Sequence, residues 1–203
     1  YTGDDGRPST GWHVEFGDVD NDGLDDVFIA KGNVEQMPAS AMSDPNNLLI
    51  QNPDGTFTER GLEAGIASMD RSRGAALVDL NLDGKLDLVV VNRRAPIEIY
   101  QNATPQSGNW LMLDVRQSGT NSRAVGGWIE VSNGENTWHR EITIGGGHAS
   151  GNSTLAHFGL GKSKFVLIRV IWPDGVASEW LKVNSNKVLR IDRGESKLSF
   201  RKL

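Results

Sequence analysis

Hydrophobic residues occur along this chain in short runs, many of them alternating with polar residues, and turn-forming residues separate the runs. Short runs rich in Val, Ile, Leu, Trp and Thr, broken by Gly, Asn, Asp or Pro, are typical of β-strands. No amphipathic stretch predicts a helix of three turns. The pattern therefore predicts an all-β protein. The expected strands cover residues 26–30, 47–51, 56–60, 75–80, 87–91, 97–101, 110–116, 127–132, 137–143, 154–158, 164–172, 178–183, 187–191 and 197–201.

The segments between these runs divide the chain further. Residues 52–56 (NPDGT) and 172–176 (WPDGV) have the composition of hairpin turns. Residues 31–46 form the longest expected loop, and residues 103–108 (ATPQSG) have the composition of a linker. A boundary at this linker predicts one domain at 1–107 and a second at 108–203.

Charge changes sign at the same boundary. Residues 1–107 carry 18 acidic and 8 basic residues, a net charge of −10, whereas residues 108–203 carry 8 acidic and 13 basic residues, a net charge of +5. Such an asymmetry supports two domains. A basic half could attract acidic glycans or nucleic acid. Its lysines and arginines are dispersed singly, however, which favours a solvated surface, and we expect no nucleic-acid binding.

Composition excludes several classes of chemistry. The chain has no cysteine, so it has no disulfide, thiolate nucleophile or zinc–cysteine site. No apolar run approaches the length of a membrane span, and we expect no membrane insertion. The chain begins at Tyr1 without a methionine or a signal-like segment. We therefore expect a processed product or the C-terminal part of a longer protein.

One acidic stretch carries a strong chemical signal. Residues 17–26 (GDVDNDGLDD) hold five aspartates, and no lysine or arginine lies between Arg7 and Lys31. Like charges so close repel one another, so the stretch needs a counter-charge. The pattern returns 61 residues later as VDLNLDGKLD at 78–87. Both stretches place oxygen-bearing side chains at positions 1, 3, 5 and 9 of a loop and glycine at position 6.

This spacing lets one short loop surround a hard cation, because alternate side chains point inward and the glycine permits a sharp bend. The carbonyl oxygen of position 7 would add a ligand. Calcium accepts six to eight oxygen ligands with flexible geometry, whereas magnesium prefers an octahedron with several waters. We therefore predict two Ca²⁺ sites. The candidate ligands are Asp18, Asp20, Asp22, Leu24 and Asp26 in the first loop and Asp79, Asn81, Asp83, Lys85 and Asp87 in the second.

The loops differ from an EF-hand, which needs a glutamate at position 12 and flanking helices. Position 12 is Ile29 in one loop and Val90 in the other, and both lie in expected strands. The alternative is a solvated acidic turn, since Asp, Asn and Gly favour turns without any ion. Two copies in the same strand–loop–strand context favour the metal site. Asp25 falls at a non-ligand position and is expected to be a surface charge only.

The 61-residue period indicates an internal repeat. The sequences FGDVDNDGLDDVFIA, LVDLNLDGKLDLVVV and NLLIQNPDGTFTERGLEAGI, between residues 16 and 91, resemble the FG-GAP or VCBS repeat. Such repeats form blades of β-propellers, as in integrin α-subunits, with calcium in the loop between the first strands of a blade. The resemblance covers about residues 11–102. It implies a partial β-propeller of about two blades.

The remainder resembles a second family. NWLMLDVRQSGTNSRAVGGWIEVSNG, HASGNSTLAHFGLGKS and VLIRVIWPDGVASEWLKVNSNKVLRID, between residues 109 and 192, look like the ASPIC/UnbV domain. FG-GAP repeats precede this domain in the cartilage acidic protein-like family and in many bacterial secreted proteins. Gly127 and Trp128 depart from the small and polar residues that this pattern leads one to expect. The resemblance implies an antiparallel β-sandwich-like domain and supplies no catalytic residues.

Enzyme signatures are absent from the sequence: it contains no G-x-S-x-G, H-E-x-x-H or P-loop motif. The glycine-rich GGGHASG at 145–151 opens no helix and is expected to be a loop. His148 and His157 could pair in space, but structural roles are favoured. Asn102 and Asn152 begin glycosylation sequons. The tryptophans are candidates for sugar stacking, although core positions are favoured for most of them: Trp12, Trp110, Trp128, Trp138, Trp172 and Trp180.

The sequence thus predicts a non-catalytic, calcium-stabilised, extracellular interaction or adhesion module. We expect it to be secreted or on a cell surface, with the periplasm as an alternative, and to bind a protein or glycan partner on a cell surface or in the matrix. Open blade edges also predict self-association. The alternatives are a carbohydrate-binding or accessory part of a larger enzyme or biosynthetic protein, and a subunit of a surface assembly.

Overall fold

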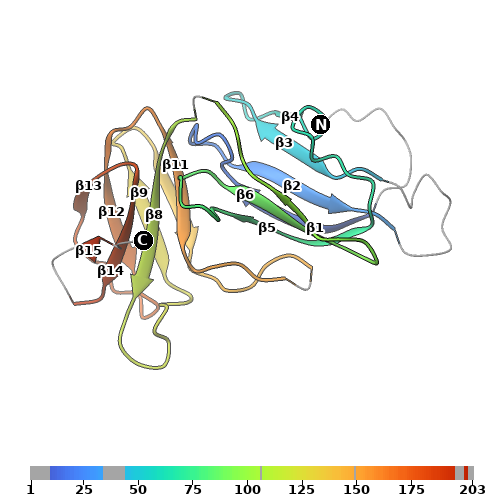
Figure 1. Cartoon of the computed structure of the whole chain (residues 1–203). Coiled ribbons are helices and arrows are strands. Elements are labelled where there is room, and N and C mark those ends of the chain that lie inside the picture. The colour runs from blue at the N-terminus through green and yellow to red at the C-terminus, as the bar shows by residue number, and fades with distance from the viewer. Residues whose placement is uncertain (1–9, 34–43, 106, 149, 195–198, 201–203) are drawn as a thin grey trace.

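The computed structural model describes residues 10–33, 44–105, 107–148, 150–194 and 199–200. Strands and turns make up these residues, with no helix among them, so the all-β prediction is confirmed. Accordingly, the described part of the chain has no helix that could span a membrane. Two β units lie side by side, the acidic unit with strands β1–β7 and the basic unit with strands β8–β15 (Figure 1).

The acidic unit consists of two antiparallel meanders. The first sheet has the order β1-β2-β3-β4, and the second has the order β5-β6-β7. The prediction of about two blades agrees with these two sheets, whereas closure into a propeller ring stays a prediction. The strands are β1 (Gly11–Gly17), β2 (Asp26–Lys31), β3 (Asn47–Gln51), β4 (Phe57–Glu59), β5 (Ser72–Val78), β6 (Asp87–Asn92) and β7 (Glu98–Tyr100).

The 61-residue period is exact in the first hairpin of each sheet. Phe16 pairs with Val27 in β1–β2, and Leu77 pairs with Leu88 in β5–β6. The register shift near the start of β1, between Gly11 and His13, also recurs near the start of β5. The repeat in the sequence is therefore a repeat of backbone conformation, bulge included.

The two sheets share one hydrophobic core. β1 and β5 lie side by side but belong to different sheets, so they meet through side chains and not through backbone pairing (Figure 1). Phe28 of the first sheet and Val90 of the second are both fully buried. The buried members of this blade core are Val19, Phe28, Ala30, Ile66, Ala75, Leu77, Leu86, Leu88 and Val90.

The second sheet has three described strands where the first has four. Leu49 of β3 pairs with Val27, and its counterpart Tyr100 of β7 pairs with Leu88, so the third strands correspond at a spacing of 51 residues. At that spacing the counterpart of β4 is residues 108–110, which instead enter β8 of the basic unit. Among the described residues, β7 therefore pairs on one side only.

The basic unit is a sandwich of two four-stranded sheets, ordered β10-β9-β12-β13 and β11-β8-β14-β15. Every pair is antiparallel, as the sequence led us to expect, except β14 with β8, which is parallel. A separate core between the sheets includes Leu111, Phe158 and Ile168. The strands are β8 (Asn109–Arg116), β9 (Trp128–Ser132), β10 (Thr137–Glu141), β11 (Ala156–Gly161), β12 (Phe165–Ile171), β13 (Leu181–Asn184), β14 (Lys187–Asp192) and β15 (Ser199–Phe200).

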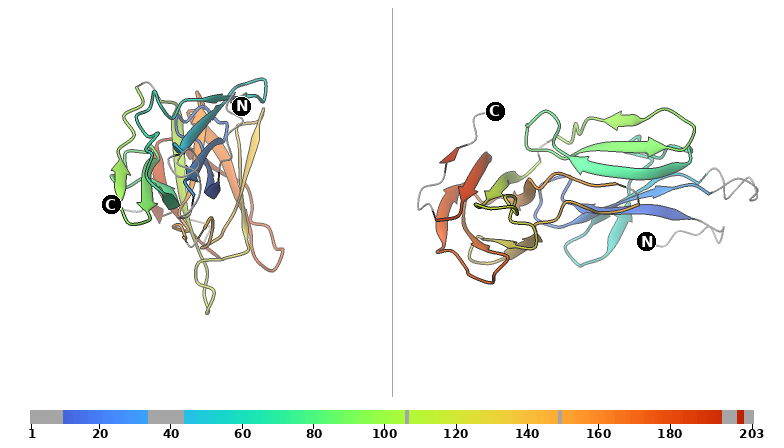
Figure 2. Two further views of the ribbon diagram at one scale, coloured as in Figure 1. Left: turned by 90° about the vertical axis from the view of Figure 1, so that its right-hand side faces the viewer. Right: turned by 90° about the horizontal axis from the view of Figure 1, so that it is seen from below.

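A long connection between β10 and β11, residues 142–155, leaves the sandwich and runs along the acidic unit; we call it the arm (Figure 2). Asn152 donates hydrogen bonds from Nδ2 to the carbonyl oxygen of Leu77 (3.1 Å) and to Glu15 Oε1 (2.6 Å). Ser150 Oγ donates to the carbonyl oxygen of Ala75 (3.3 Å). The arm thus satisfies polar groups of β1 and β5, the neighbouring strands of the two sheets.

The strand predictions were close except at the first strand. The strand–loop–strand repeat implied β1, but β1 was given no bounds in the sequence analysis; its sequence GWHVEFG carries a histidine where an alternating pattern would need an apolar residue. The structure buries that histidine, His13, to 2% exposure and pairs it with Glu15 (2.8 Å). Most of the expected loop at 31–46 and part of the expected strand at 197–201 lie outside the described residues.

Candidate metal centre

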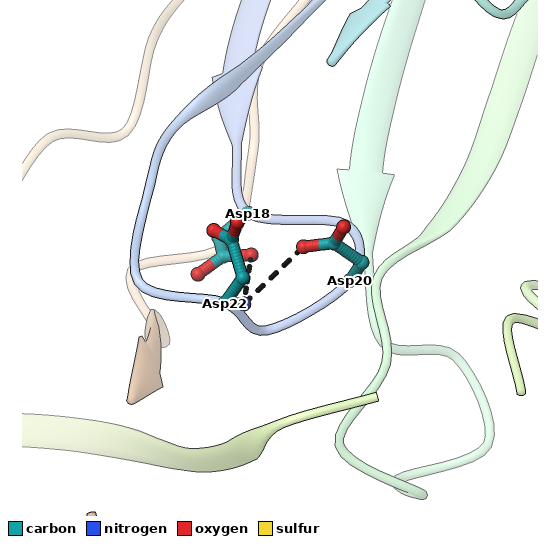
Figure 3. Close-up of side chains that lie close together, drawn as sticks. All are labelled: Asp18, Asp20 and Asp22. Carbon is teal, nitrogen blue, oxygen red and sulfur yellow. Dashed lines mark hydrogen bonds between the residues drawn. The ribbon is translucent and has the colours of Figure 1, made fainter. Parts of the chain in front are cut away.

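The first acidic loop brings three carboxylates together. Oxygen atoms of Asp18, Asp20 and Asp22 lie within 4.8 Å of one another, and the side chains gather on the inside of the loop (Figure 3). Asp18 is 2% exposed, Asp20 is partly exposed and Asp22 is exposed, so the cluster runs from the protein interior to solvent. A hard cation entering from solvent would meet oxygen ligands at increasing depth.

Backbone amides of the loop hold these carboxylates in place. Asp18 accepts hydrogen bonds from the amides of Asp22 (3.0 Å) and Gly23 (2.7 Å). Asp22 Oδ1 accepts from the amide of Leu24 (2.8 Å). These bonds fix the inward direction of the side chains, although part of each carboxylate's lone-pair capacity remains.

The second acidic loop repeats this conformation. Asp79 accepts from the amides of Asp83 (3.1 Å) and Gly84 (2.7 Å), as Asp18 does 61 residues earlier. The two position-6 glycines have φ of +99° (Gly23) and +87° (Gly84), a left-handed region that other residues rarely adopt. The oxygen set here is Asp79, Asn81 and Asp83, which carries one charge fewer than the first loop. The first loop therefore offers a cation the stronger electrostatic attraction.

Asp26 and Asp87, at position 9 of the two loops, hold the loops in place by accepting backbone hydrogen bonds. Asp26 accepts hydrogen bonds from the amides of Val19 and Gln51, both 2.9 Å. Asp87 accepts from the corresponding amides at Leu80 (3.0 Å) and Asn102 (2.8 Å). Asp26 thus joins its loop to β3, and Asp87 joins its loop to the segment that follows β7. Their role as direct calcium ligands stays a prediction, as does that of the carbonyl oxygens of Leu24 and Lys85.

Electrostatics favour a bound cation in the first loop. Burial is the largest cause that raises the pKa of Asp18, to about 8, while the hydrogen bond from Gly23 lowers it and the neighbouring aspartates raise it further. Burial likewise raises the pKa of Asp26 to about 7. An ionised carboxylate buried without a counter-charge destabilises the fold, and a divalent cation removes that cost. The all-oxygen ligand set fits calcium, which would supply this positive charge and tie the ends of the loop together.

The sequence did not predict that the sandwich covers both loops. The Trp138 indole of β10 donates from Nε1 to the carbonyl oxygen of Gly23 (2.7 Å). The Trp110 ring of β8 lies so close to Gly84 that a Cβ built there would be 1.9 Å from it. Asn21 is fully buried and donates from Nδ2 to the carbonyl oxygen of Gly84 (3.0 Å), which joins the two loops. Nothing in the linear pattern of either tryptophan signals these contacts.

Asp25 is more than a surface charge, which corrects our expectation. Its carboxylate forms an ion pair with Arg140 of β10, because the covered first loop faces the sandwich. His157 and His148 do not pair in the way the sequence left open. The Nε2 of His157 lies 3.1 Å from the carbonyl oxygen of Gly84, whereas the His148 ring packs edge-on against Trp12. A carbonyl oxygen only accepts, so Nε2 of His157 carries the proton.

One serine, histidine and glutamate do meet in space, near the turn of the arm where Gly146 pairs with Ser150. Ser150 Oγ lies 3.2 Å from Nδ1 of His13, whose Nε2 lies 2.8 Å from Glu15 Oε2. A catalytic serine needs an accessible hydroxyl and room beside the histidine. A Cβ at Gly147 would lie 1.8 Å from Nδ1 of His13, so backbone covers the ring, and the hydroxyl faces carbonyl oxygens. The geometry supports a docking contact of the arm.

The structure also shows the surroundings of the two glycosylation sequons and the exposure of the tryptophans. Asn102 donates from Nδ2 to the carbonyl oxygens of Val19 (2.7 Å) and Leu86 (3.1 Å), and the Nδ2 of Asn152 is engaged by the arm contacts. An attached glycan would displace these bonds. Trp172 is buried, whereas Trp128 (44% exposed) and Trp180 (39%) remain accessible on the sandwich.

A stability test follows from position 4 of the loops. Asn21 has φ of +62° and Leu82 has φ of +63°, and the left-handed region costs leucine more than asparagine. We expect Leu82→Asn to raise the free energy of unfolding by roughly 0.5–1 kcal/mol. Thermal denaturation of the calcium-free protein measures it. An unchanged or lower melting temperature would show that the partly buried leucine side chain outweighs the backbone strain.

Comparison with known proteins supports both halves of the sequence analysis. Residues 32–90 match the FG-GAP-like repeat, and residues 117–198 match ASPIC and UnbV. The chain is 28% identical to cartilage acidic protein 1 of Mus musculus over 194 residues, covering 91% of this chain and 29% of the relative. It is 26% identical to the Homo sapiens protein of the same name over 172 residues, covering 83% of this chain and 26% of the relative.

The chain spans less than a third of the length of these relatives. The loop at 79–87 lies inside the matched repeat, and the loop at 18–26 precedes it but has the same conformation. The FG-GAP-like match, in the acidic unit, precedes the ASPIC and UnbV match, in the basic unit. This is the order that the two resemblances in the sequence led us to expect. The chain therefore has a segment similar to the FG-GAP-like repeat, followed by a segment similar to ASPIC and UnbV.

Proposed function

We propose that this chain is a non-catalytic, extracellular interaction module that two calcium ions stabilise. One observation carries the proposal: two loops 61 residues apart hold oxygen ligands in the same conformation, and three carboxylates meet in the first. The name of the relatives refers to cartilage, a tissue rich in extracellular matrix, which supports secretion and a partner in the matrix or on a cell surface. The role of the ions is structural, since each loop joins two strands.

Calcium titration tests the proposal. We expect calorimetry to show two ions per chain, with dissociation constants on the order of 10⁻⁴ M or weaker, as in extracellular calcium modules. Binding to the folded state alone stabilises by about 2.7 kcal/mol per site when calcium is a hundred times its dissociation constant. Chelation should therefore lower the melting temperature, and calcium should restore it. Absence of calcium uptake by the unaltered protein would refute the proposal.

Single substitutions separate the two sites. Asp22 and Asp83 are exposed, so Asp22→Ala and Asp83→Ala remove a ligand without opening a cavity. Each is expected to remove one of the two binding events and to leave the calcium-free melting temperature within about 2 °C. Asp70→Ala is the matched control, because Asp70 is an exposed aspartate outside both loops. Loss of a site in this control would point to general electrostatics and not to ligation.

A glycan is the second candidate partner, and the outer face of one sandwich sheet favours it. Arg169 of β12 bonds Glu130 of β9, and the Arg169 guanidinium lies 4.6 Å from the centre of the Trp180 ring. Trp128, two residues from Glu130, emerges on the same face. Exposed indoles beside paired polar groups suit sugar rings. A glycan array with calcium and with chelator, compared for the unaltered protein and Trp128→Ala, tests this candidate, and equal signals for both proteins would exclude this face.

Self-association is a further expectation at β7, which has no second neighbour among the described strands. Ile99 of β7 is 62% exposed, and Ile97, just before the strand, is 57% exposed. An open edge with apolar side chains recruits other strands. Sedimentation of the unaltered protein and of Ile99→Lys measures this tendency. A monomer at all concentrations would remove self-association from the proposal.

A further inference from the structure

We propose that the sandwich forms part of both metal loops: it clamps them in the ion-binding conformation, so that calcium binding and docking of the sandwich stabilise each other. This inference rests on the proposed calcium function. The contacts that carry it come from three strands of the sandwich and from the linker, and they reach both loops at equivalent positions.

The equivalent positions are the glycines at position 6, each of which lies beneath a tryptophan. Trp138 covers Gly23 and donates to its carbonyl oxygen, and a Cβ at Gly23 would lie 3.2 Å from the ring. Trp110 covers Gly84, whose carbonyl oxygen lies within hydrogen-bond distance of Nε2 of His157. The carboxylates precede these glycines directly, so the two indoles limit how far either loop can open.

The first loop makes the closest approach to the sandwich. Gly161 donates from its amide to the carbonyl oxygen of Asn21 (2.8 Å), and Gly108 donates to that of Asp20 (2.9 Å). A Cβ built at Gly159 would lie 1.7 Å from Oδ2 of Asp18, the deepest carboxylate of the cluster. The backbone of β11 therefore forms one wall of the site, and only glycine leaves room for the carboxylate.

The ion pair between the sandwich and the first loop is consistent with a clamp, because it uses none of the candidate calcium ligands. Arg140 pairs with Asp25, the aspartate outside the ligand positions, and so attracts the acidic unit without neutralising the carboxylate cluster. Because the sandwich contacts the loops in their folded conformation, it lowers the ordering cost of ion binding. Linkage then requires the converse, namely that a bound ion strengthens the docking by the same factor.

Matched glycine substitutions in the full chain test the clamp. We expect Gly159→Ala to weaken calcium binding at the first loop about tenfold, within the range usual for coupled sites. Gly145→Ala is the control: Gly145 lies in the arm with no atom within 4 Å of a built Cβ and no left-handed φ. Calorimetry gives the affinities. Trp138→Phe keeps an aromatic ring but removes the indole donor. This second variant tests the clamp if Gly159→Ala does not fold.

The results of these titrations distinguish failure of the clamp from failure of the proposed calcium function. A several-fold weaker first site in Trp138→Phe, with Gly145→Ala unchanged, supports the clamp. If the unaltered protein binds two ions and the folded variants bind them equally well, the clamp is wrong while the calcium function stands. If the unaltered protein binds none, the proposed function itself fails.

Hydrogen exchange tests the converse direction in the unaltered protein. Calcium should slow exchange of the Gly108 and Gly161 amides, which belong to the linker and to β11 and donate into the first loop. Slowing confined to residues 18–26 would overturn the coupling.

Discussion

Replacing Phe28 with alanine is expected to destabilise the two blades by about 3–5 kcal/mol while the sandwich remains folded. Phe28 is fully buried in the blade core, together with residues of both sheets, so its removal leaves a cavity that both share. A loss of this size is a large fraction of the stability of an ordinary domain. The sandwich has its own core, which contains no residue of the blades.

Hydrogen exchange resolved by strand checks this expectation. Amides of β2 and β6 should exchange much faster in Phe28→Ala, whereas those of β9 and β12 should change little. Phe16→Ala makes the same deletion at a residue that is 67% exposed, and its effect should stay within about 0.5 kcal/mol. Equal acceleration in β2 and β12 would show that the two units unfold as one, and the predicted boundary at 107/108 would then have no thermodynamic meaning.

The hydrophobic pattern was sufficient for most of the secondary structure, because its short apolar or alternating runs are bounded by turn-forming residues. In β12, for example, Val166, Ile168 and Val170 are buried while Phe165 and Leu167 are exposed. This alternation is local and can be read from sequence. The pattern failed at β1, where a buried His13 and an exposed Phe16 reverse the usual assignment. It also could not foresee the parallel pairing of β14 with β8, which depends on tertiary topology.

The acidic loops were predictable for a related reason. Side-chain spacing within nine residues decides which oxygens can meet, and the structure brings Asp18, Asp20 and Asp22 together as that spacing requires. The surroundings of the loops were not predictable. Trp138 and Gly23 lie 115 residues apart in the chain, and neither residue type specifies the other. The brace at Asp26 was hidden as well, since its partner amide at Gln51 belongs to a different strand.

In calcium-free buffer, the free energy of unfolding is expected to fall as the pH rises from about 6.5 to 8. Asp18 and Asp26 have pKa values raised to about 8 and about 7, mainly by burial. The unfolded carboxyls titrate near pH 4 and hold no protons in this range. The folded state therefore binds more protons, and its stability declines with rising pH by roughly 1–2 kcal/mol over the window.

His157 acts in the opposite direction but at lower pH, because burial lowers its pKa to about 4 and its stabilising effect is lost as the pH falls below about 6.5. The window above pH 6.5 therefore isolates the carboxylates.

Calcium should abolish the decline, since the ion replaces the protons, and its stabilisation should grow with pH. Asp18→Asn, which imitates the protonated acid, should reduce the decline and lose the first calcium site. Chemical denaturation at several pH values measures each quantity. A calcium-free stability that rises from pH 6.5 to 8 would mean that the folded protein already holds these carboxylates as anions, and the electrostatic reason for the ion would disappear.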